Sequence, residues 1–530
     1  MENFTHLHVH SSYSLLDGYC KPRDLVNRAV YLGMDSIAVT DHNHVGGIPE
    51  FFEEARTVGI KPIAGLEAYY TPDRSILSSP AANRNALAAD AAFQAGVITE
   101  EERDAIVEQR KGVKGIKEIK ERTQPYLYDT KGYHILFLAM NQNGWRNLVK
   151  MNSEAAATCT FNGRFHVDIP LVRKYADDLI CTTACVASYP ARKIFAGDTE
   201  AAEAYVDTFH EIFGDRFYLE VQPLTIPEQM AVNRQYVAWS KEKNIKLVAT
   251  NDVHYVTEWD HNDHDTLLCV GTKRYKDETD RMRYTNDFWL RSRKEMEEYF
   301  KKNAGDDTGL YEAYVAAMNE TNIIAGRCDD KINFGADNSL LPKANLPDGE
   351  KSSKSHITRL AYDGLYKIAK RESFDKDKLA EYESRLAYEM DVVTKRHFED
   401  YMLVVREYVT WAREHDIPVG PGRGSACGSL LLYCLGITHS VDPIKYNLLF
   451  ERFLTVDKKG FPDIDVDFSK FKRESVIRHL EDEYGKDNVC HIGTYTQIGV
   501  KSGLKDIARV FRYSFDDANA ISKEIDELAE

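Results

Sequence analysis

The sequence predicts an α/β protein in which a distorted, seven-stranded β/α barrel is followed by an α+β domain and the start of a helical one. Three observations predict this fold. Short apolar runs alternate with helix-like segments up to about residue 260, as βα units do. Several of these runs end in polar residues, which is where a barrel places its functional groups. After about residue 270 the alternation stops and helical patterns dominate.

The predicted strands follow one another with helical segments between them. The clearest helix spans residues 21–33, where Pro22 stands near the start and Gly33 ends the pattern. About seven such strand–helix units are enough to close, or nearly close, a barrel. The strands are predicted at residues 4–10, 35–42, 61–70, 133–140, 177–185, 216–222 and 245–255.

Residues 74–130 interrupt this alternation and carry no strand pattern. The segment is rich in Ala, Glu, Lys and Arg, and VITEEERDAIVEQR predicts a helix that opens at Thr99. Its charges are typical of a solvated helix face. We therefore expect a surface insertion within the barrel.

The rest of the chain divides into stretches of different character. Residues 338–356 are polar and rich in Pro, Gly and Ser, as in a linker or exposed loop. Residues 379–415 and 472–530 show helical patterns. The predicted domains are a barrel over 1–270, a second domain over 271–470 and part of a third over 471–530.

Composition narrows the possible partners and the compartment. The formal net charge of −16 does not indicate a nucleic-acid-binding surface, although a large acidic enzyme can still line one groove with Lys and Arg. Nine cysteines without CxxC pairs suit a reducing cytoplasm rather than a disulfide framework. The chain shows neither an apolar stretch of membrane-spanning length nor a signal-peptide pattern. We expect a cytoplasmic protein with no membrane contact.

Residues of the kinds that bind metals recur at the ends of the predicted strands. His8 and His10 point the same way because side chains alternate across a strand. Imidazoles with carboxylates and one thiol suit Zn²⁺, Mn²⁺ or Fe²⁺ better than Ca²⁺ or Mg²⁺ alone. They are too many for one ion, so we expect two or three. The candidates are His8, His10, Asp17, Asp41, His42, Glu67, His134, Cys185, Asp252 and His254.

Clustered ions clamp a phosphate and lower the pKa of a bound water, so the predicted chemistry is phosphoester hydrolysis. Taken singly, each histidine is more often a hydrogen-bonded structural residue than a metal ligand, and Cys185 is more often a small buried hydrophobe. The metal hypothesis depends on recurrence, since HxH, TDH, GLE and NDVH each close a predicted strand. His6 and His44 are left out of the ligand set, and His6 is expected to support or pack.

A glycine-rich motif, GPGRGSACGS, precedes the apolar run LLLYCLGI. A glycine-rich turn that opens a helix presents free N–H groups to phosphate oxygens. Ser425 and Ser429 add hydroxyl groups, and Arg423 adds positive charge. Many such turns bind nothing, so this motif is weak evidence when it stands alone.

About 40 residues later, FPDIDVDF alternates acidic and apolar residues with the period of a strand. Asp463, Asp465 and Asp467 would then share one face, and their mutual repulsion favours bound cations. Two carboxylates that bridge two Mg²⁺ ions form the two-metal arrangement of nucleotidyl transfer, in which one ion activates a 3′-hydroxyl and the other holds a triphosphate. The alternative is a solvent-facing acidic edge strand.

The first set of motifs resembles a known family. THLHVHSSYSLLDG, VTDHNHVGG, GLEAYY and TNDVHY resemble the polymerase-and-histidinol-phosphatase (PHP) domain, in the form found at the N-terminus of bacterial C-family replicative DNA polymerases. The resemblance implies a trinuclear metal site that is a 3′–5′ proofreading exonuclease in some members and only structural in others. No matched position is degraded here, and the insertion at 74–130 is the main departure. The implied ligands are His8, His10, Asp17, His42, Glu67, His134, Cys185, Asp252 and His254.

The second set is similar to the nucleotidyltransferase-like palm of the same polymerases, through PVGPGRGSACGSLLLYCLGIT, DPIKYNLLFERFL and FPDIDVDF. Asp463 is a weaker candidate than the other two acids, and Cys427 stands where alanine is usual. A basic helix resembling the thumb could contact the duplex backbone, although a solvated face explains it equally well. The implied roles are catalysis for Asp465 and Asp467, triphosphate binding for Gly424, Ser425 and Arg452, and DNA binding for Lys501 and Lys505.

The resemblance covers nearly the whole chain in the family's order of PHP domain, palm and beginning of the thumb. The family's third catalytic carboxylate, fingers, sliding-clamp motif and OB domain would follow later. We therefore expect a complete exonuclease site and an incomplete polymerase site, completed by a second polypeptide or by the remainder of a longer chain. The implied partners are primer–template DNA, dNTPs and replisome components such as a sliding clamp.

Two other hypotheses stay open. A free-standing PHP phosphoesterase acting on a small phosphorylated metabolite would use the same metal chemistry, but it has no use for GRGS followed by PDIDVD. A non-catalytic scaffold would keep the barrel only to brace the palm, and retention of every ligand type argues weakly against it.

Overall fold

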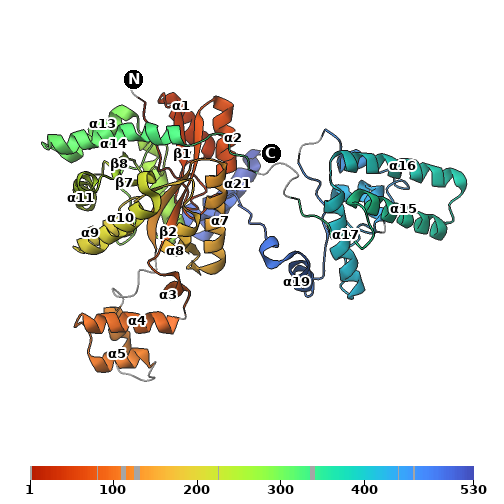
Figure 1. The fold of residues 1–530 in the computed structure, drawn as a ribbon, viewed down its shortest axis with the longest axis horizontal. Helices are drawn as coiled ribbons and strands as arrows, with labels where there is room; N and C mark the ends of the chain where they lie inside the picture. Colours follow the sequence, from red (N-terminus) through yellow and green to blue (C-terminus); the bar gives the residue numbers. More distant parts are fainter. Residues whose placement is uncertain are drawn as a thin grey trace. The chain divides into compact units, whose positions relative to one another are not determined.

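The computed structural model describes residues 3–79, 81–108, 115–123, 132–224, 226–334, 341–439, 441–457 and 460–529. It divides into two compact units, shown in Figure 1. Unit 1 comprises Met1–Ile332 and Ile498–Glu530, and unit 2 comprises Asn333–Gln497. The predicted domain boundaries at residues 270 and 470 differ from the limits of these units and stay predictions. Among the described helices, none is long and apolar enough to span a membrane.

Unit 1 is built around a barrel that the sequence predicted. The first predicted strand, residues 4–10, forms isolated bridges rather than a regular strand: His6 pairs with Ile37, and Val9 pairs with Val253. These bridges join the segment to both of its neighbours and close the ring. The regular strands of the ring are β1 (Ser36–Val39), β2 (Lys61–Tyr70), β3 (Tyr133–Ala139), β6 (Leu179–Thr182), β7 (Phe217–Val221) and β8 (Lys246–Ala249).

One strand of this ring runs against the others. β3 is antiparallel to both β2 and β6, whereas β1 with β2, β6 with β7, and β7 with β8 are parallel. The first residues of β3 therefore lie at the end of the barrel where the parallel strands finish. Two short strands that the sequence did not predict, β4 (Thr160–Phe161) and β5 (Arg164–Val167), extend the sheet beside β2.

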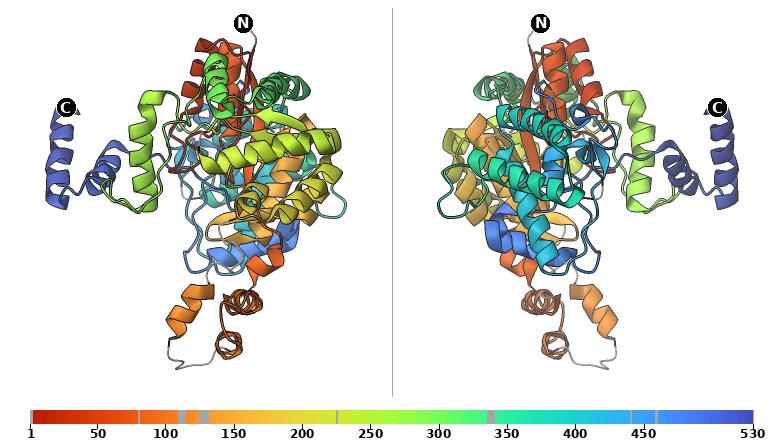
Figure 2. Two further views of the ribbon diagram at one scale, coloured as in Figure 1. Left: turned by 90° about the vertical axis from the view of Figure 1, so that its left-hand side faces the viewer. Right: turned by 90° about the vertical axis from the view of Figure 1, so that its right-hand side faces the viewer.

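Helices surround the strands of the barrel (Figure 2). The predicted helix at 21–33 is confirmed as α1, which starts with Pro22 and buries Leu25, Val26 and Ala29. The covering helices are α1 (Pro22–Tyr31), α2 (Ile48–Val58), α7 (Gln142–Thr158), α8 (Ile169–Tyr175), α9 (Tyr189–Phe195), α10 (Thr199–Phe213), α11 (Pro227–Lys243), α12 (His261–Thr272), α13 (Arg293–Ala304) and α14 (Thr308–Arg327).

The described part of the predicted insertion consists of helices with short turns between them. α5 opens at Thr99, whose hydroxyl accepts a hydrogen bond from the Glu102 N–H while the Glu102 carboxylate accepts one from the Thr99 N–H. This reciprocal capping confirms the predicted helix start. Residues 109–114 and 124–130 of the insertion lie outside the described residues. Its helices are α3 (Arg74–Ser78), α4 (Ala81–Gln94), α5 (Glu100–Val107) and α6 (Ile116–Thr123).

The segment after α12 is tied to that helix by ion pairs on Asp265. Arg281 donates to both carboxylate oxygens of Asp265 at 2.5 and 2.8 Å, and Lys276 donates at 2.7 Å. Burial would raise the pKa of Asp265, but these two cations hold it well below its usual range. A carboxyl group with a depressed pKa stabilises the fold above its unfolded-state pKa and loses that contribution as pH falls.

Asp265→Asn is therefore expected to lower the free energy of unfolding by about 2 kcal/mol near neutral pH, the usual size for hydrogen bonds to charged groups. The difference from wild type should shrink as the pH falls below about 4, where the unfolded carboxyl group becomes protonated. Urea unfolding at a series of pH values measures this difference. A gap that stays constant down to low pH would contradict the ion-pair explanation.

Unit 2 is helical, and its core lies between three long helices and the short helix that follows the glycine-rich motif. The helical pattern predicted over residues 379–415 forms two helices, because His397 adopts a left-handed conformation (φ 57°) between them. Residues 341–352 of the predicted linker (338–356) have no regular element, but its last four residues belong to α15. The elements of unit 2 are α15 (Ser353–Glu372), α16 (Lys376–Lys395), α17 (Glu399–Glu414), η5 (Gly424–Gly428), α18 (Leu430–Cys434), η6 (Phe450–Arg452), α19 (Arg473–Tyr484) and η7 (Lys486–Asn488).

The prediction of a strand at FPDIDVDF is wrong. The alternation is present, since Ile464 is buried while Asp463 and Asp467 are exposed. However, the segment is extended without forming a strand, and its one bridge joins Phe468 to Val419. Prolines at 418 and 421 flank the partner segment, and because proline has no N–H a longer ladder cannot form there.

The predicted helical end of the chain is observed as α19 in unit 2 and as α20 (Val500–Val510) and α21 (Phe515–Ala529) in unit 1. Within unit 1, α20 packs beside α12 and α21. The region is helical as predicted, but it does not form one separate compact unit.

Candidate metal centre and glycine-rich loop

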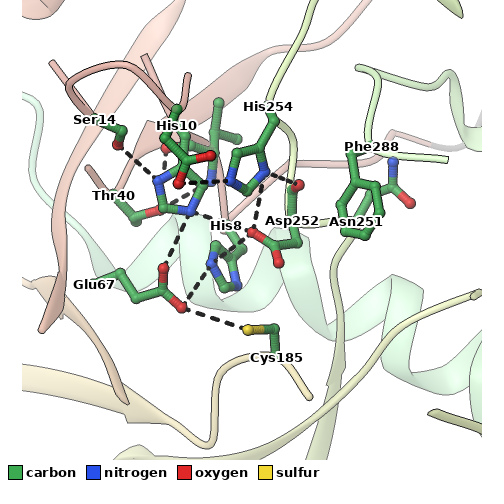
Figure 3. A network of polar contacts seen from close by, with 12 residues as sticks. His8, His10, Ser14, Thr40, Glu67, Cys185, Asn251, Asp252, His254 and Phe288 are labelled. Atoms are coloured by element: carbon green, nitrogen blue, oxygen red, sulfur yellow. Dashed lines mark hydrogen bonds and ion pairs between the residues drawn. The ribbon is translucent and has the colours of Figure 1, made fainter. Parts of the chain in front are cut away.

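Glu67, near the end of β2, lies at the centre of a buried cluster (Figure 3). One oxygen of its carboxylate is 2.9 Å from His134 Nδ1 and 3.2 Å from His8 Nε2. The other oxygen is 2.8 Å from His42 Nδ1 and 3.2 Å from His10 Nε2. A single carboxylate therefore meets four of the five histidines predicted as ligands.

The segment that follows β8 supplies the opposite wall. Asp252 Oδ1 lies 3.1 and 3.2 Å from the Nε2 atoms of His8 and His10. Asp17, in the loop after the first segment, places Oδ2 3.3 Å from His42 Nε2 and 3.8 Å from His254 Nε2. Residues from the first and the last segments of the barrel thus lie close together at one end of it.

Cys185 completes the cluster beside His134. Its Sγ is 3.4 Å from His134 Nδ1 and 3.8 Å from the Glu67 carboxylate. His134 joins the cluster from the beginning of β3 because that strand is antiparallel to its neighbours. The structure therefore brings together all nine residues that the sequence resemblance implied, while their role as ligands stays a prediction.

The buried polar atoms of the cluster are arranged as metal ligands would be. Buried polar atoms without a hydrogen-bond partner are costly, and among the described residues many of them gather here. Groups of three or four ligand atoms lie within 4.8 Å of one another in three overlapping sets: His10, His42 and His254; His8, His10, Glu67 and Asp252; and His42, Glu67 and His134. The unpartnered atoms of the cluster are His8 Nε2, His10 Nε2, Asp17 Oδ1, His42 Nδ1, Glu67 Oε2, Asp252 Oδ1 and His254 Nε2.

The charges of the cluster are strongly coupled. Burial would raise the pKa of Glu67, but the neighbouring His134, His8 and His42 hold it well below its usual range. Burial would likewise raise the pKa of Asp252, but His8 and His254 lower it. Both carboxylates are therefore anionic over the physiological range and available to a cation.

Among the described residues, four of the thirteen non-glycine residues with a positive φ lie in or beside the cluster. Asp252 has a positive φ of 50°, and Leu16, Asn43 and Ala184, each next to one of the predicted ligands, have φ values of 57–61°. Such conformations cost about 1–3 kcal/mol in unfavourable cases and persist where surrounding structure enforces them. Their position beside the cluster supports a functional role for it.

Glu220 on β7 supports the cluster, and sequence reasoning missed it. Its buried carboxylate accepts hydrogen bonds from His8 Nδ1 at 2.7 Å, Gln222 Nε2 at 3.0 Å and Thr250 Oγ1 at 2.5 Å. The first bond fixes the His8 ring so that Nε2 faces Glu67. One signal was available, because a lone glutamate stood in the otherwise apolar strand FYLEV.

Ser14 supports the cluster from the other side. Its hydroxyl contacts His10 Nδ1 at 2.9 Å, accepts from the His42 N–H at 3.0 Å and donates to Asp41 at 2.8 Å. Asp41, a candidate from its place at a strand end, therefore holds this serine. His6 is outside the cluster, as expected, with Nε2 2.8 Å from the Arg291 carbonyl.

Glu220→Gln is expected to weaken metal binding by about 10–100-fold, the usual cost of removing a group that orients a ligand. A neutral amide no longer holds the His8 imidazole by a charged hydrogen bond, and its NH₂ group confronts other donors. Titration of the metal-free chain with Mn²⁺ measures the affinity. Glu320→Gln, which removes the exposed contact with Lys246, is the matched control. Equal Mn²⁺ affinities for both variants would show that Glu220 does not support metal binding.

In unit 2, the glycine-rich motif meets the acidic segment. Arg423 Nη2 is 3.0 Å from Asp465 Oδ1, and its Nε is 3.5 Å from Asp467 Oδ2. Gly424 has a φ of +64°, and a Cβ on it would lie 3.5 Å from Asp465 Oδ2. Gly420 donates its N–H to the Asp467 carbonyl at 2.8 Å. Two motifs about 40 residues apart therefore form one surface.

The remaining predicted residues lie around these elements. Ser425 is partly exposed on η5, and Arg452 is exposed on η6, which packs beside η5. Asp463 is exposed on the same extended segment as the other acids. Lys501 and Lys505 are exposed one turn apart on α20, in unit 1.

Comparison with known proteins decides the family. Residues 6–223 match the PHP domain, and residues 355–530 match the domain described as the bacterial DNA polymerase III alpha NTPase domain. The DNA polymerase III subunit alpha of Borreliella burgdorferi is 34% identical over 523 residues, covering 98% of this chain and 40% of that protein. The corresponding subunit of Aquifex aeolicus is 33% identical and covers 98% and 41%. The chain belongs to the DNA polymerase III alpha family.

This chain thus spans about two fifths of the length of the polymerase III alpha relatives it matches. Among solved structures, a two-domain protein with a predicted PHP-like metal-dependent phosphoesterase from Bacteroides vulgatus is 14% identical, covering 48% of this chain and 52% of its own, with a TM-score of 0.26.

The two family matches contain most of the predicted site residues, but not all of them. The PHP match ends at residue 223, before Asp252 and His254. These two nevertheless lie in the cluster, because β8 and the segment after it close the barrel. The polymerase III alpha match contains the glycine-rich loop, the acidic segment and both lysines of α20.

Proposed function

We propose that this chain carries the exonuclease site of a replicative DNA polymerase together with the first part of its polymerase site. One observation supports this most strongly. Nine side chains of the kinds that bind metals, from sequence-distant segments, meet in one cluster in which seven buried polar atoms have no hydrogen-bond partner, in a chain of the polymerase III alpha family.

The proposed ligands of the cluster are the nine residues named above, holding two or three ions of Zn²⁺, Mn²⁺ or Fe²⁺. Ions bound there would lower the pKa of a water and neutralise the scissile phosphate. The oxygen of a water would give up a proton and form the new bond to the phosphorus, as the bond to the 3′-oxygen of the preceding nucleotide breaks. That oxygen takes up a proton, and a nucleoside 5′-monophosphate leaves. In this step Glu220 and Ser14 hold the imidazoles of His8 and His10 in place.

The proposed polymerase residues act on a different substrate. Asp465 and Asp467 would hold Mg²⁺, and Gly424, Ser425 and Arg452 would bind the triphosphate of an incoming dNTP. Lys501 and Lys505 would contact the backbone of the primer–template. We propose that the third catalytic carboxylate, the fingers and the contact with a sliding clamp come from a second polypeptide or a longer chain. Free cysteines among the described residues suit a cytoplasmic location.

The test uses the purified chain with a 5′-labelled primer that ends in a 3′ mismatch. With Mn²⁺ the primer should shorten by single nucleotides, and with Mg²⁺ and dNTPs it should not lengthen. Histidinol phosphate in a parallel assay tests the alternative of a metabolite phosphatase. Release of inorganic phosphate from it without primer shortening would overturn the exonuclease proposal. Primer extension by the chain alone would overturn the incomplete polymerase site.

A further inference from the structure

A carboxylate that belongs to neither site is fully buried in unit 2. Glu389 on α16 accepts hydrogen bonds from the Ser429 hydroxyl at 2.8 Å and from the N–H groups of Leu430 and Leu431 at 3.0 and 2.9 Å. Arg385, one turn earlier on the same helix, donates its Nε at 2.7 Å. Glu389 therefore binds the end of the glycine-rich loop at three consecutive residues.

Arg385 extends this contact to a second segment. Its Nη2 donates to the carbonyl of Gly428 at 3.0 Å and to that of Leu448 at 3.1 Å. Gly428 is the last residue of η5, and Leu448 stands two residues before η6. The two segments are also in close backbone contact, since a Cβ on Gly428 would lie 2.7 Å from the Leu449 carbonyl. One ion pair thus joins η5 to the segment that carries Arg452.

The pair does more than cap a helix. At the start of α18 the Ser429 hydroxyl accepts from the Leu432 N–H, and Glu389 accepts from the Leu430 and Leu431 N–H groups, which a helix start leaves without an intrahelical partner. Arg385 reaches beyond this helix, to the Leu448 carbonyl. Burying a carboxylate costs several kcal/mol unless it is paired and hydrogen-bonded. Burial raises the pKa of Glu389, against the opposing effect of the Leu431 and Leu430 amides and of Arg385. Several directional hydrogen bonds on one buried group fix the positions of the segments that donate them.

We propose that Arg385 and Glu389 form a positioning pair for nucleotide binding, which holds the Gly424–Gly428 turn and Arg452 in one fixed arrangement. Among the described residues neither side chain forms a hydrogen bond or an ion pair with the acidic segment, so both act through the loop. The inference rests on the proposed dNTP-binding role of that loop. It adds two residues from a helix that carries none of the predicted site residues.

The test compares binding of dGTP with Mg²⁺ to the whole chain by isothermal titration calorimetry. Glu389→Gln keeps the volume but turns an NH₂ group toward backbone donors, and we expect the Kd to rise by at least about tenfold, as for other supporting groups. Arg385→Lys keeps the charge beside Glu389 but loses the two carbonyl contacts, and a smaller rise is expected. Hydrogen exchange should speed up at residues 428–432 in both variants.

Tyr382→Phe is the matched control. Tyr382 is buried on the same helix and donates to Asp442 at 2.7 Å, away from η5. It should leave the Kd within about twofold of wild type, although it also removes one buried hydrogen bond. If Glu389→Gln unfolds the chain, Arg385→Lys, which disturbs the core less, carries the test.

The outcomes separate the inference from the function on which it rests. Wild type that binds no dGTP would overturn the proposed nucleotide site itself, and the inference with it. Wild type that binds dGTP, with both variants binding equally well, would overturn the positioning role alone. A rise in Kd that Tyr382→Phe reproduces would show that general loss of stability, and not the pair, sets the affinity.

Discussion

Glu67→Gln is expected to abolish metal-dependent release of 3′ nucleotides and to strip the PHP domain of most of its bound metal. The Glu67 carboxylate lies within 3.2 Å of nitrogen atoms from four histidines. It belongs to two of the three overlapping ligand sets. A neutral amide removes the negative charge and offers one acceptor instead of two. The loss of activity should exceed about 100-fold, the upper end for residues that only support ligands. Metal content per chain and the rate of primer shortening in Mn²⁺ measure the effect.

Glu154→Gln provides the control on the same barrel. Glu154 pairs with Lys174 at 2.6 Å on the surface, so its removal should change neither metal content nor rate. Full metal content in Glu67→Gln would contradict the ligand assignment. Loss of activity that appears only together with loss of the folded state would support the scaffold hypothesis, in which the barrel only braces the palm and its metals are structural. Circular dichroism and thermal unfolding of the variant distinguish the two.

Much of this cluster was predictable from local sequence. His8 and His10 share a face because the strand period is two, and Glu67 and Asp252 stand near the ends of apolar runs. Parallel strands that close a ring bring such ends together without any further information. The first segment behaves this way although it forms bridges instead of a regular strand, since its backbone is extended all the same.

Other parts depended on pairings that no local pattern contains. His134 stands at the start of its strand, and it reaches the cluster only because β3 runs antiparallel to its neighbours. Glu220 looks like one polar residue in a core strand until β7 is placed beside β8, whose following segment pairs with the first segment. FPDIDVDF carries the strand alternation, yet whether it pairs is decided by the prolines of its partner. In each case the local sequence did not tell which strand or segment would lie beside it.

Glu389 shows the same limit within a helix. The pattern over residues 379–415 predicts a helix with a buried face, and Glu389 lies on that face. A glutamate in such a position is explained only by the donors it meets, and these come from Ser429 to Leu431, about 40 residues later. Helical periodicity therefore predicted helical structure here, but neither the break at His397 nor the contacts of Glu389.

Arg291→Met is expected to have the largest effect on stability, lowering the free energy of unfolding by about 3–5 kcal/mol, the usual cost of breaking a buried charged pair. Arg291 is fully buried and donates to Asn251 Oδ1 at 3.0 Å and to Asp287 Oδ1 at 3.1 Å. Its guanidinium group also lies 3.5 Å from the ring centre of Tyr299. Methionine fills the volume of the aliphatic stem but leaves the two oxygens without their donor. Urea unfolding of the whole chain measures the change.

The variant should also lose metal, because Asn251 immediately precedes Asp252. Asn251 donates to the carbonyls of Asp287 and Trp289 at 2.9 and 2.7 Å, and Arg291 fixes its amide from the other side. Arg173→Met, which removes an exposed contact with Glu211, should cost only about 0–1 kcal/mol and leave the metal in place. A stability loss under 1 kcal/mol in Arg291→Met would contradict the buried-pair argument. A large loss with metal content unchanged at a temperature where the variant is folded would show that the strained backbone at Asp252 is held by the ligands themselves rather than by Arg291.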